Sequence, residues 1–229
     1  MKYKALFFFA ALLAAIFLAR GPAAAGDLSV APQVGTLGFG LNAGYQVNDY
    51  FKLRANTNYL PYSRSDNVRD VDYRAKLDFF TIGALGDVHV LGGGFRLTGG
   101  VYYVDLSLTA DAKLTSDKSY TIGGNTYTAQ ELGTWKGSVE WKTLAPYAGL
   151  GYGSGSGNEP GFGFSCDLGA LYIGKSSVHF DPSASMRQAA ADHGYDLQSD
   201  VKKEEDEVKS YADKVQFWPV ISFGVVYRF

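Results

Sequence analysis

Alternation of apolar and polar residues is the feature that most constrains the fold of this chain. In residues 37–47 the odd positions are apolar or aromatic, and the even positions are glycine, Asn42 or Gln46. After the turn pair Asn48-Asp49, residues 51–59 alternate in the same way. Successive side chains of a β-strand point to opposite faces, so the two segments predict a hairpin with one apolar face.

The same pattern returns in residues 73–79, 95–103, 162–172 and 221–229. A seventh segment, residues 139–153, alternates in two phases. Val139 and Trp141 fall on the apolar side at its start, and Leu150 falls on that side at its end. Because Pro146 cannot donate a hydrogen bond to the ladder, we expect a bulge near it that exchanges the two faces.

An eighth strand is required if the segments form a membrane barrel, because single-chain bacterial barrels have even strand numbers. Residues 28–34 are the only candidate, although Pro32 interrupts them. The turns at 48–49, 86–94 and 154–160 are then periplasmic, and residues 61–72, 109–137 and 175–215 form outward loops, with a first outward connection of only Gly35-Thr36. We expect an all-β, antiparallel up-and-down transmembrane barrel of eight strands, with short periplasmic turns and long outward loops.

The N-terminus predicts export. A basic start at Lys2 and Lys4 precedes an apolar run over residues 5–19 and the small residues up to Ala25. This order is typical of a secretory signal peptide. We predict a signal peptide over residues 1–25 and a barrel domain over residues 26–229. The chain has 21 basic and 23 acidic residues, which gives no reason to expect a nucleic-acid partner.

A soluble antiparallel sandwich would alternate in the same way, so the apolar face needs independent support. Aromatic residues at the strand ends supply it, because membrane barrels carry an aromatic girdle at each interface. The predicted outer girdle is Tyr59, Tyr62, Tyr73, Tyr103 and Trp141, and the inner girdle is Tyr45, Tyr50, Tyr152, Phe162 and Tyr227.

Charged residues on the polar faces are the candidates for the lumen and its selectivity. They are Lys52, Arg54, Arg74, Lys76, Asp78, Arg96, Glu140, Lys142 and Asp167. An eight-stranded barrel is just wide enough to be filled by its own side chains. One interpretation is therefore a plug of ion pairs, and the other is a narrow polar path. With Arg228 the set is mostly basic, which predicts anion preference in any open state.

The last outward loop differs in kind from the others. Residues 199–215 are rich in charge and place valines at helical spacing. This pattern predicts a helix, either solvated on the surface or acting as a lid over the barrel mouth.

The three histidines, His89, His179 and His193, are the candidates for an enzyme site. Asp192-His193 with Ser183 or Ser185 would supply the residue types of a hydrolase triad, but no spacing demands it. No two histidines have the short spacing of a metal site. We expect no catalytic residues, cofactor or metal, and the single cysteine, Cys166, excludes an internal disulfide.

Three segments carry a family resemblance. They are Ala145-Pro146-Tyr147-Ala148-Gly149-Leu150-Gly151, the run from Asp167-Leu168-Gly169 through Tyr172 to Gly174, and the tail from Trp218-Pro219-Val220-Ile221 to Val226-Tyr227-Arg228-Phe229. The chain resembles small Gram-negative outer-membrane barrels of the CarO and OmpW-like kind. The ending, with Val225, Tyr227 and Phe229 on one face, resembles the signal read by the outer-membrane assembly machinery.

The resemblance implies an outer-membrane location, with lipid, lipopolysaccharide and the assembly machinery as partners. It also implies porin-like transport of small polar solutes through a narrow channel. A surface structural or adhesive barrel with a plugged lumen is the second hypothesis, and an outer-membrane hydrolase is the third, because one barrel fold serves several functions.

Overall fold

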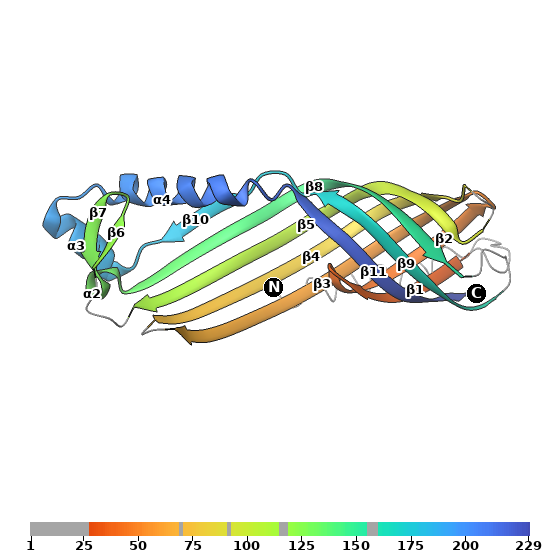
Figure 1. Cartoon of the computed structure of the whole chain (residues 1–229), viewed down its shortest axis with the longest axis horizontal. Coiled ribbons are helices and arrows are strands. Elements are labelled where there is room, and N and C mark those ends of the chain that lie inside the picture. Colours follow the sequence, from red (N-terminus) through yellow and green to blue (C-terminus); the bar gives the residue numbers. More distant parts are fainter. Residues whose placement is uncertain (1–27, 69–70, 91–92, 115–118, 155–159) are drawn as a thin grey trace.

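A computed structural model describes residues 28–68, 71–90, 93–114, 119–154 and 160–229 (Figure 1). The predicted signal peptide lies outside the described residues. None of the helices in these ranges is long and apolar enough to cross a membrane.

Eight antiparallel strands close into a barrel, as the sequence predicted. They are β1 (Leu28–Gly35), β2 (Gly38–Asn48), β3 (Phe51–Val68), β4 (Val71–Val88), β5 (Phe95–Leu114), β8 (Thr134–Gly153), β9 (Gly161–Tyr172) and β11 (Phe217–Arg228). Each strand pairs with the next of this series, except that β11 pairs with both β9 and β1 and so closes the barrel. The interrupted segment around Pro32 is a true strand, because β1 pairs with β2 on one side and β11 on the other.

An apolar band covers the outside of the barrel. Along β11 the outward residues Phe217, Ile221, Phe223 and Val225 are all exposed, and β9 exposes Phe162 to 82%. From Phe217 to Tyr227 a strand rises about 33 Å, or about 25 Å at the usual tilt, which is the height of the apolar band of membrane barrels. Soluble monomers seldom expose so large an apolar surface. The barrel is therefore a transmembrane barrel of the outer-membrane type, surrounded by lipid.

Several residues lie on the face opposite to the predicted one, and Val139 is one of them, since it packs against the interior cluster. Phe79 on β4 and Trp141 on β8 point into the barrel, with exposures of 0% and 7%. The β5–β8 register is unbroken from Phe95↔Tyr152 to Lys113↔Thr134, so the predicted bulge near Pro146 is absent from this ladder. Leu37, which was assigned to the apolar outer face, is also buried in the interior.

Four neighbouring strands are longer than the rest and leave the barrel together. β3 and β4 have 18 residues and β5 and β8 have 20, whereas β1, β2, β9 and β11 have 8 to 12. Figure 1 shows their outward ends as an open sheet. Much of the predicted loops 61–72 and 109–137 is therefore strand. β10 (Ser177–Asp181) extends this sheet by pairing with β8.

A small second core lies on the outward sheet. A hairpin of β6 (Ser119–Ile122) and β7 (Asn125–Thr128) packs with α2 (Ala129–Leu132) and α3 (Ala184–His193). Tyr127, Leu132 and Met186 form the centre of this core. The predicted helix exists as α4 (Leu197–Ala212), and its buried Asp200 accepts hydrogen bonds from Asn125 and Tyr127, which fasten the hairpin to the helix.

Candidate functional site: the barrel lumen

Four charged side chains meet in the barrel interior. Arg54 Nε lies 2.6 Å from Asp87 Oδ2, and Arg54 Nη2 lies 3.0 Å from Asp167 Oδ1. Arg96 Nη2 lies 2.7 Å from the same Asp167 oxygen, and Thr98 donates a hydrogen bond of 2.7 Å to Asp87. All four charged residues are buried. Two arginines and two aspartates make this ion cluster neutral, as buried charges require.

A glycine gives Arg96 its place in the ion cluster. A Cβ atom built on Gly151 of β8 would lie 2.5 Å from Arg96 Nε. Any larger residue would displace the guanidinium. Gly151 therefore leaves space for a charged side chain that crosses the lumen.

Uncharged polar residues continue the packing beside the ion cluster. Asn56 donates to Asn42, Asn58 donates to Asn56 and Thr81, and Gln33 donates to Asn58 at 2.6 Å. Each amide is satisfied by its neighbours and ties β1, β2, β3 and β4 together. Such a connected network is held in one arrangement, because an unpaired buried amide would be costly.

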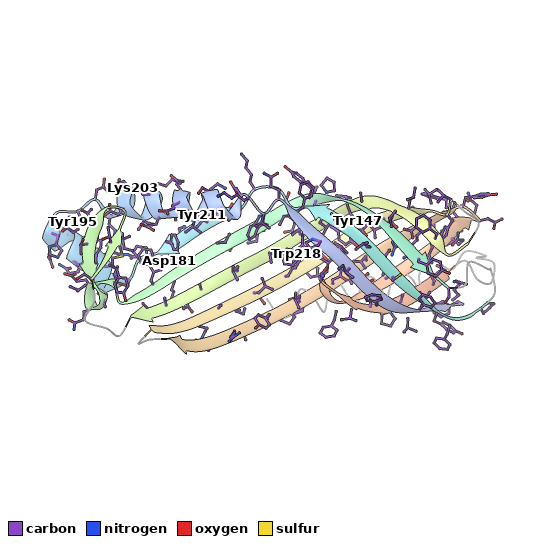
Figure 2. The ribbon with its side chains drawn as sticks, viewed as in Figure 1. Tyr147, Asp181, Tyr195, Lys203, Tyr211 and Trp218 are labelled. Carbon is purple, nitrogen blue, oxygen red and sulfur yellow. The ribbon has the colours of Figure 1, made fainter. Side chains whose placement is uncertain are left out.

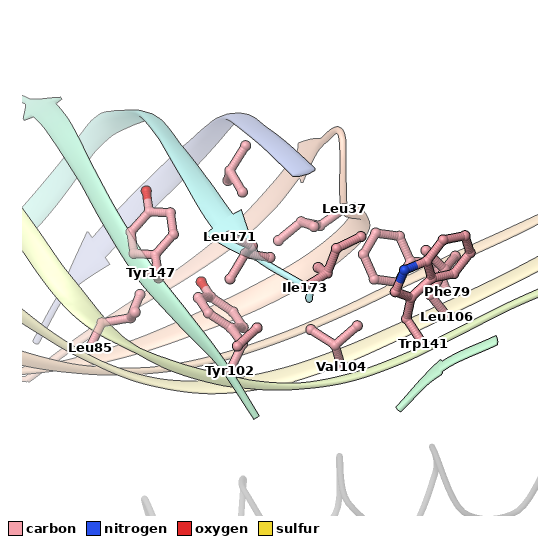
Figure 3. Packing of buried hydrophobic residues seen from close by; sticks show 12 residues of the cluster. Leu37, Phe79, Leu85, Tyr102, Val104, Leu106, Trp141, Tyr147, Leu171 and Ile173 are labelled. Atoms are coloured by element: carbon pink, nitrogen blue, oxygen red, sulfur yellow. The ribbon is translucent and has the colours of Figure 1, made fainter. Parts of the chain in front are cut away.

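An apolar layer packs in the outward half of the lumen (Figure 3). The inward residues of five strands and of the chain next to β1 and β9 form it: Leu37, Phe79, Leu85, Tyr102, Val104, Leu106, Trp141, Ala145, Tyr147, Leu171, Ile173 and Val220. Phe79 meets Trp218 edge to face with ring centroids 4.8 Å apart, and Tyr102 meets Tyr147 in the same way at 5.6 Å. Figure 2 labels Tyr147, on β8, and Trp218, on β11.

The lumen contains a smaller and a larger internal space. The smaller, of about 10 Å³, touches Arg54, Tyr102, Tyr147 and Asp167. It has room for about one water molecule. The larger, of about 60 Å³, lies toward the short turns, where Lys52 and Arg228 line it. The ion cluster and the apolar layer lie between this larger cavity and the outward end.

The structure brings only some of the predicted lumen residues together. Arg54, Arg96 and Asp167 form the ion cluster, and Lys52 lines the cavity below it. The other five candidates lie on the outer face of the sheet: Arg74, Lys76, Asp78, Glu140 and Lys142. There Lys76 pairs with Asp78, and Lys142 Nζ lies 2.7 Å from Glu140. Their predicted inward orientation is wrong, because the phases of β4 and β8 were misassigned.

Asp87 is the member of the ion cluster that was not among the predicted lumen residues. It was assigned to a periplasmic turn over residues 86–94, but β4 extends to Val88 and Asp87 is 0% exposed. The alternation Thr81, Gly83, Leu85, Asp87 on the inner face is the signal that would have found it.

The residues of the possible triad have other partners. His193 Nε2 lies 3.0 Å from Glu131, and Asp192 accepts a hydrogen bond from Gln188. The Ser183 hydroxyl caps α3 by accepting from Met186 N, and it donates to the Leu132 carbonyl. Groups of three metal-ligating side chains are absent from the described ranges.

The α4 helix lies along the outward sheet, beside β10 (Figure 1). Glu205 on the helix accepts a hydrogen bond of 3.0 Å from Phe180 N on β10. Only Ala212, at the end of the helix, packs against the apolar layer. The helix is thus fastened to the extension along its length.

No protein-family model matches the sequence, and no curated protein matches it either. Among solved structures, Acinetobacter baumannii CarO2 is 22% identical with a TM-score of 0.58, over 88% of this chain and 98% of that one. Acinetobacter baumannii CarO is 20% identical with a TM-score of 0.57, over 92% of this chain and 100% of that one. The chain therefore has the eight-stranded barrel fold of the two CarO structures, as the resemblance implied.

Proposed function

We propose that this chain is a structural barrel with a closed lumen, which holds an outward sheet-and-helix extension at the cell surface. The observation that carries the proposal is the pair of successive closures, the neutral ion cluster and the apolar layer beyond it. A solute in transit would have to separate the ion cluster. Breaking a buried ion pair costs about 3–5 kcal/mol, so thermal opening would be rare.

The extension has the features of a scaffolded surface element. Four long strands continue from the barrel without interruption, and a second apolar core holds the β6–β7 hairpin against α3. Residues on a rigid support suit binding or adhesion better than residues on a loop. Lipopolysaccharide would surround the outer face near Lys76 and Lys142.

Solute flux into proteoliposomes tests the closed lumen. Liposomes with the protein should take up glycine and arabinose no faster than empty liposomes of the same lipid. Uptake that rises with the amount of folded barrel, and falls as the solute grows, would show an open path and overturn the proposal.

A narrow channel is the second candidate, and the larger cavity favours it. This cavity of about 60 Å³ reaches from the short turns to Arg54 and Arg96. In such a channel, selectivity would depend on the lumen more than on the exposed charges of α4, which salt screens over about 8–10 Å. Arg54→Gln with Arg96→Gln should then lower anion selectivity more than neutralising residues 204–207. A larger shift from the α4 variant would exclude the lumen as the filter.

The last strand would carry the assembly signal. Val225, Tyr227 and Phe229 share the outward face, with the Tyr227 and Phe229 rings 5.1 Å apart. We propose that the assembly machinery reads this face. Phe229→Ser should reduce the barrel recovered in the outer membrane, whereas Arg228→Ser, on the inward face, should reduce it less.

A further inference from the structure

We propose that the periplasmic end of the lumen is a binding site for a small soluble oxyanion, such as phosphate or a carboxylate. The site is the cavity of about 60 Å³, lined by Ser29, Lys52, His89, Ser154 and Arg228, with Arg54 and Arg96 at its inner end. Below, it is called the basic cavity. Binding of an oxyanion in the basic cavity does not require that the lumen conducts.

The basic cavity has the size of a small anion. Its lining includes Gln46, Gly94 and Gly153, at the strand ends beside the short turns. A water molecule needs about 10–15 Å³ by the same measure, so the space holds roughly four to six waters. This room suits a tetrahedral oxyanion or a carboxylate.

The charge of the basic cavity is positive. Lys52, Arg54, Arg96 and Arg228 line it, and Asp87 is the single acidic residue among the lining residues that the structure describes. Asp87 and Asp167 already balance Arg54 and Arg96 within the ion cluster. The ion cluster therefore does not neutralise the charge of Lys52. Because salt screens charges poorly in a narrow space, an anion bound there would be attracted to Lys52.

Lys52 is the residue best placed to bind. Its Nζ donates a hydrogen bond of 2.7 Å to Ser29 Oγ, and no described carboxylate lies within ion-pair distance of it. An ammonium has three donors, so two remain for a ligand. Gly44 keeps this position open, because a Cβ atom there would lie 2.3 Å from Lys52 Cε.

Further donors line the same space. The Ser29 and Ser154 side chains and the Arg228 guanidinium belong to the lining, and Arg228 Nη2 donates 3.1 Å to the Ser154 carbonyl. This contact places the guanidinium at the rim. Ammonium, guanidinium and hydroxyl donors around one small space are the groups that recognise oxyanions.

Calorimetric titration of the full-length mature barrel in lipid nanodiscs tests the proposal, with inorganic phosphate and then acetate as probes at constant ionic strength. The wild type should bind at least one of them saturably with one site. Lys52→Met should weaken binding about tenfold or more, which is the loss expected for one charge-assisted hydrogen bond. Lys142→Met removes an exposed charge from the outer face and should leave binding unchanged.

A second variant keeps the charge of Lys52 and changes its position together with that of Ser29. Gly44→Ala should displace Lys52 and also weaken binding, while the heat-modifiable gel mobility of the barrel reports folding. Tighter binding of phosphate would assign an inorganic or ester phosphate, and tighter binding of acetate would assign a carboxylate. Heat that appears only in nanodiscs of anionic lipid would instead assign a lipid headgroup. Absence of saturation with both probes, or equal binding by wild type and Lys52→Met, would overturn the proposal.

Discussion

Arg54 and Asp167 meet across the full width of the barrel, with Nη2 and Oδ1 3.0 Å apart. Their strands, β3 and β9, are separated by four steps around the barrel in either direction. One ion pair thus joins opposite walls of the lumen. This ion pair therefore holds β3 and β9 together across the lumen.

Removal of Asp167 should destabilise the barrel strongly. Asp167→Ala leaves Arg54 and Arg96 buried with too little negative charge, and breaking such pairs costs about 3–5 kcal/mol. Glu140→Ala, which breaks an exposed pair with Lys142, should cost about 1 kcal/mol or less. Urea unfolding in lipid vesicles, followed by tryptophan fluorescence, measures both free energies. Equal losses for the two variants would contradict a bracing role for the ion cluster.

An arginine on the lipid face should be costly in proportion to its depth. Leu150 and Leu144 both point outward on β8, but Leu144 pairs with Tyr103 of the predicted outer girdle. Leu150→Arg, two residues inside Tyr152 of the predicted inner girdle, should therefore cost more than Leu144→Arg, which should cost about 0–1 kcal/mol. The same urea titration measures the difference. A cost that is the same at both depths would contradict the position assigned to the bilayer.

Chemical labelling of intact cells should report which end faces outward. In a Cys166→Ala background, Asp206→Cys on α4 should react with a membrane-impermeant maleimide, because the Asp206 side chain is exposed. Asp49→Cys, in the short turn between β2 and β3, should react only after the outer membrane is disrupted. The reverse pattern of labelling would invert the topology.

Acid should loosen the contact between α2 and α3. The hydrogen bonds that Glu131 accepts from His193 and Thr128 lower the pKa of this carboxyl to about 2 from 4.5. A depressed pKa means that the stabilisation is complete above pH 4.5 and is lost as the pH falls through about 2. The NMR shift of the Thr128 amide should titrate with a midpoint near 2, and Glu131→Gln should abolish this titration. A midpoint near 4.5 would show that the contacts do not form in solution.

The sequence predicted the strands well where lipid and lumen differ in polarity. Over residues 51–59 of β3, 95–99 of β5 and 162–168 of β9 the outward side chains are mostly apolar and the inward ones are polar or glycine, so alternation identified both faces. It failed in β4 and at the start of β8 for one physical reason. There Phe79 and Trp141 belong to an apolar layer inside the barrel, while Arg74 and Lys142 lie on an outer face close to water. In these segments an apolar residue can therefore face the barrel interior, so apolar character does not identify the lipid-facing side.

The ion cluster was only half predictable. Arg54, Arg96 and Asp167 follow from the alternation of their own strands, but their mutual distances depend on how eight strands close. Asp87 was lost because the end of β4 was placed too early. The end of a strand depends on its pairing with a neighbouring strand, and Asp87 pairs with Thr98 of β5. This pairing cannot be inferred from the sequence of β4 alone.

Single-channel recording in planar bilayers tests the closed lumen most directly, because ions are the smallest probes of a continuous path. The folded wild-type barrel should insert without unitary conductance steps in potassium chloride, since the apolar layer and the ion cluster close the lumen in series. Regular unitary steps from the wild type, absent from heat-denatured samples of the same preparation, would contradict the closed barrel.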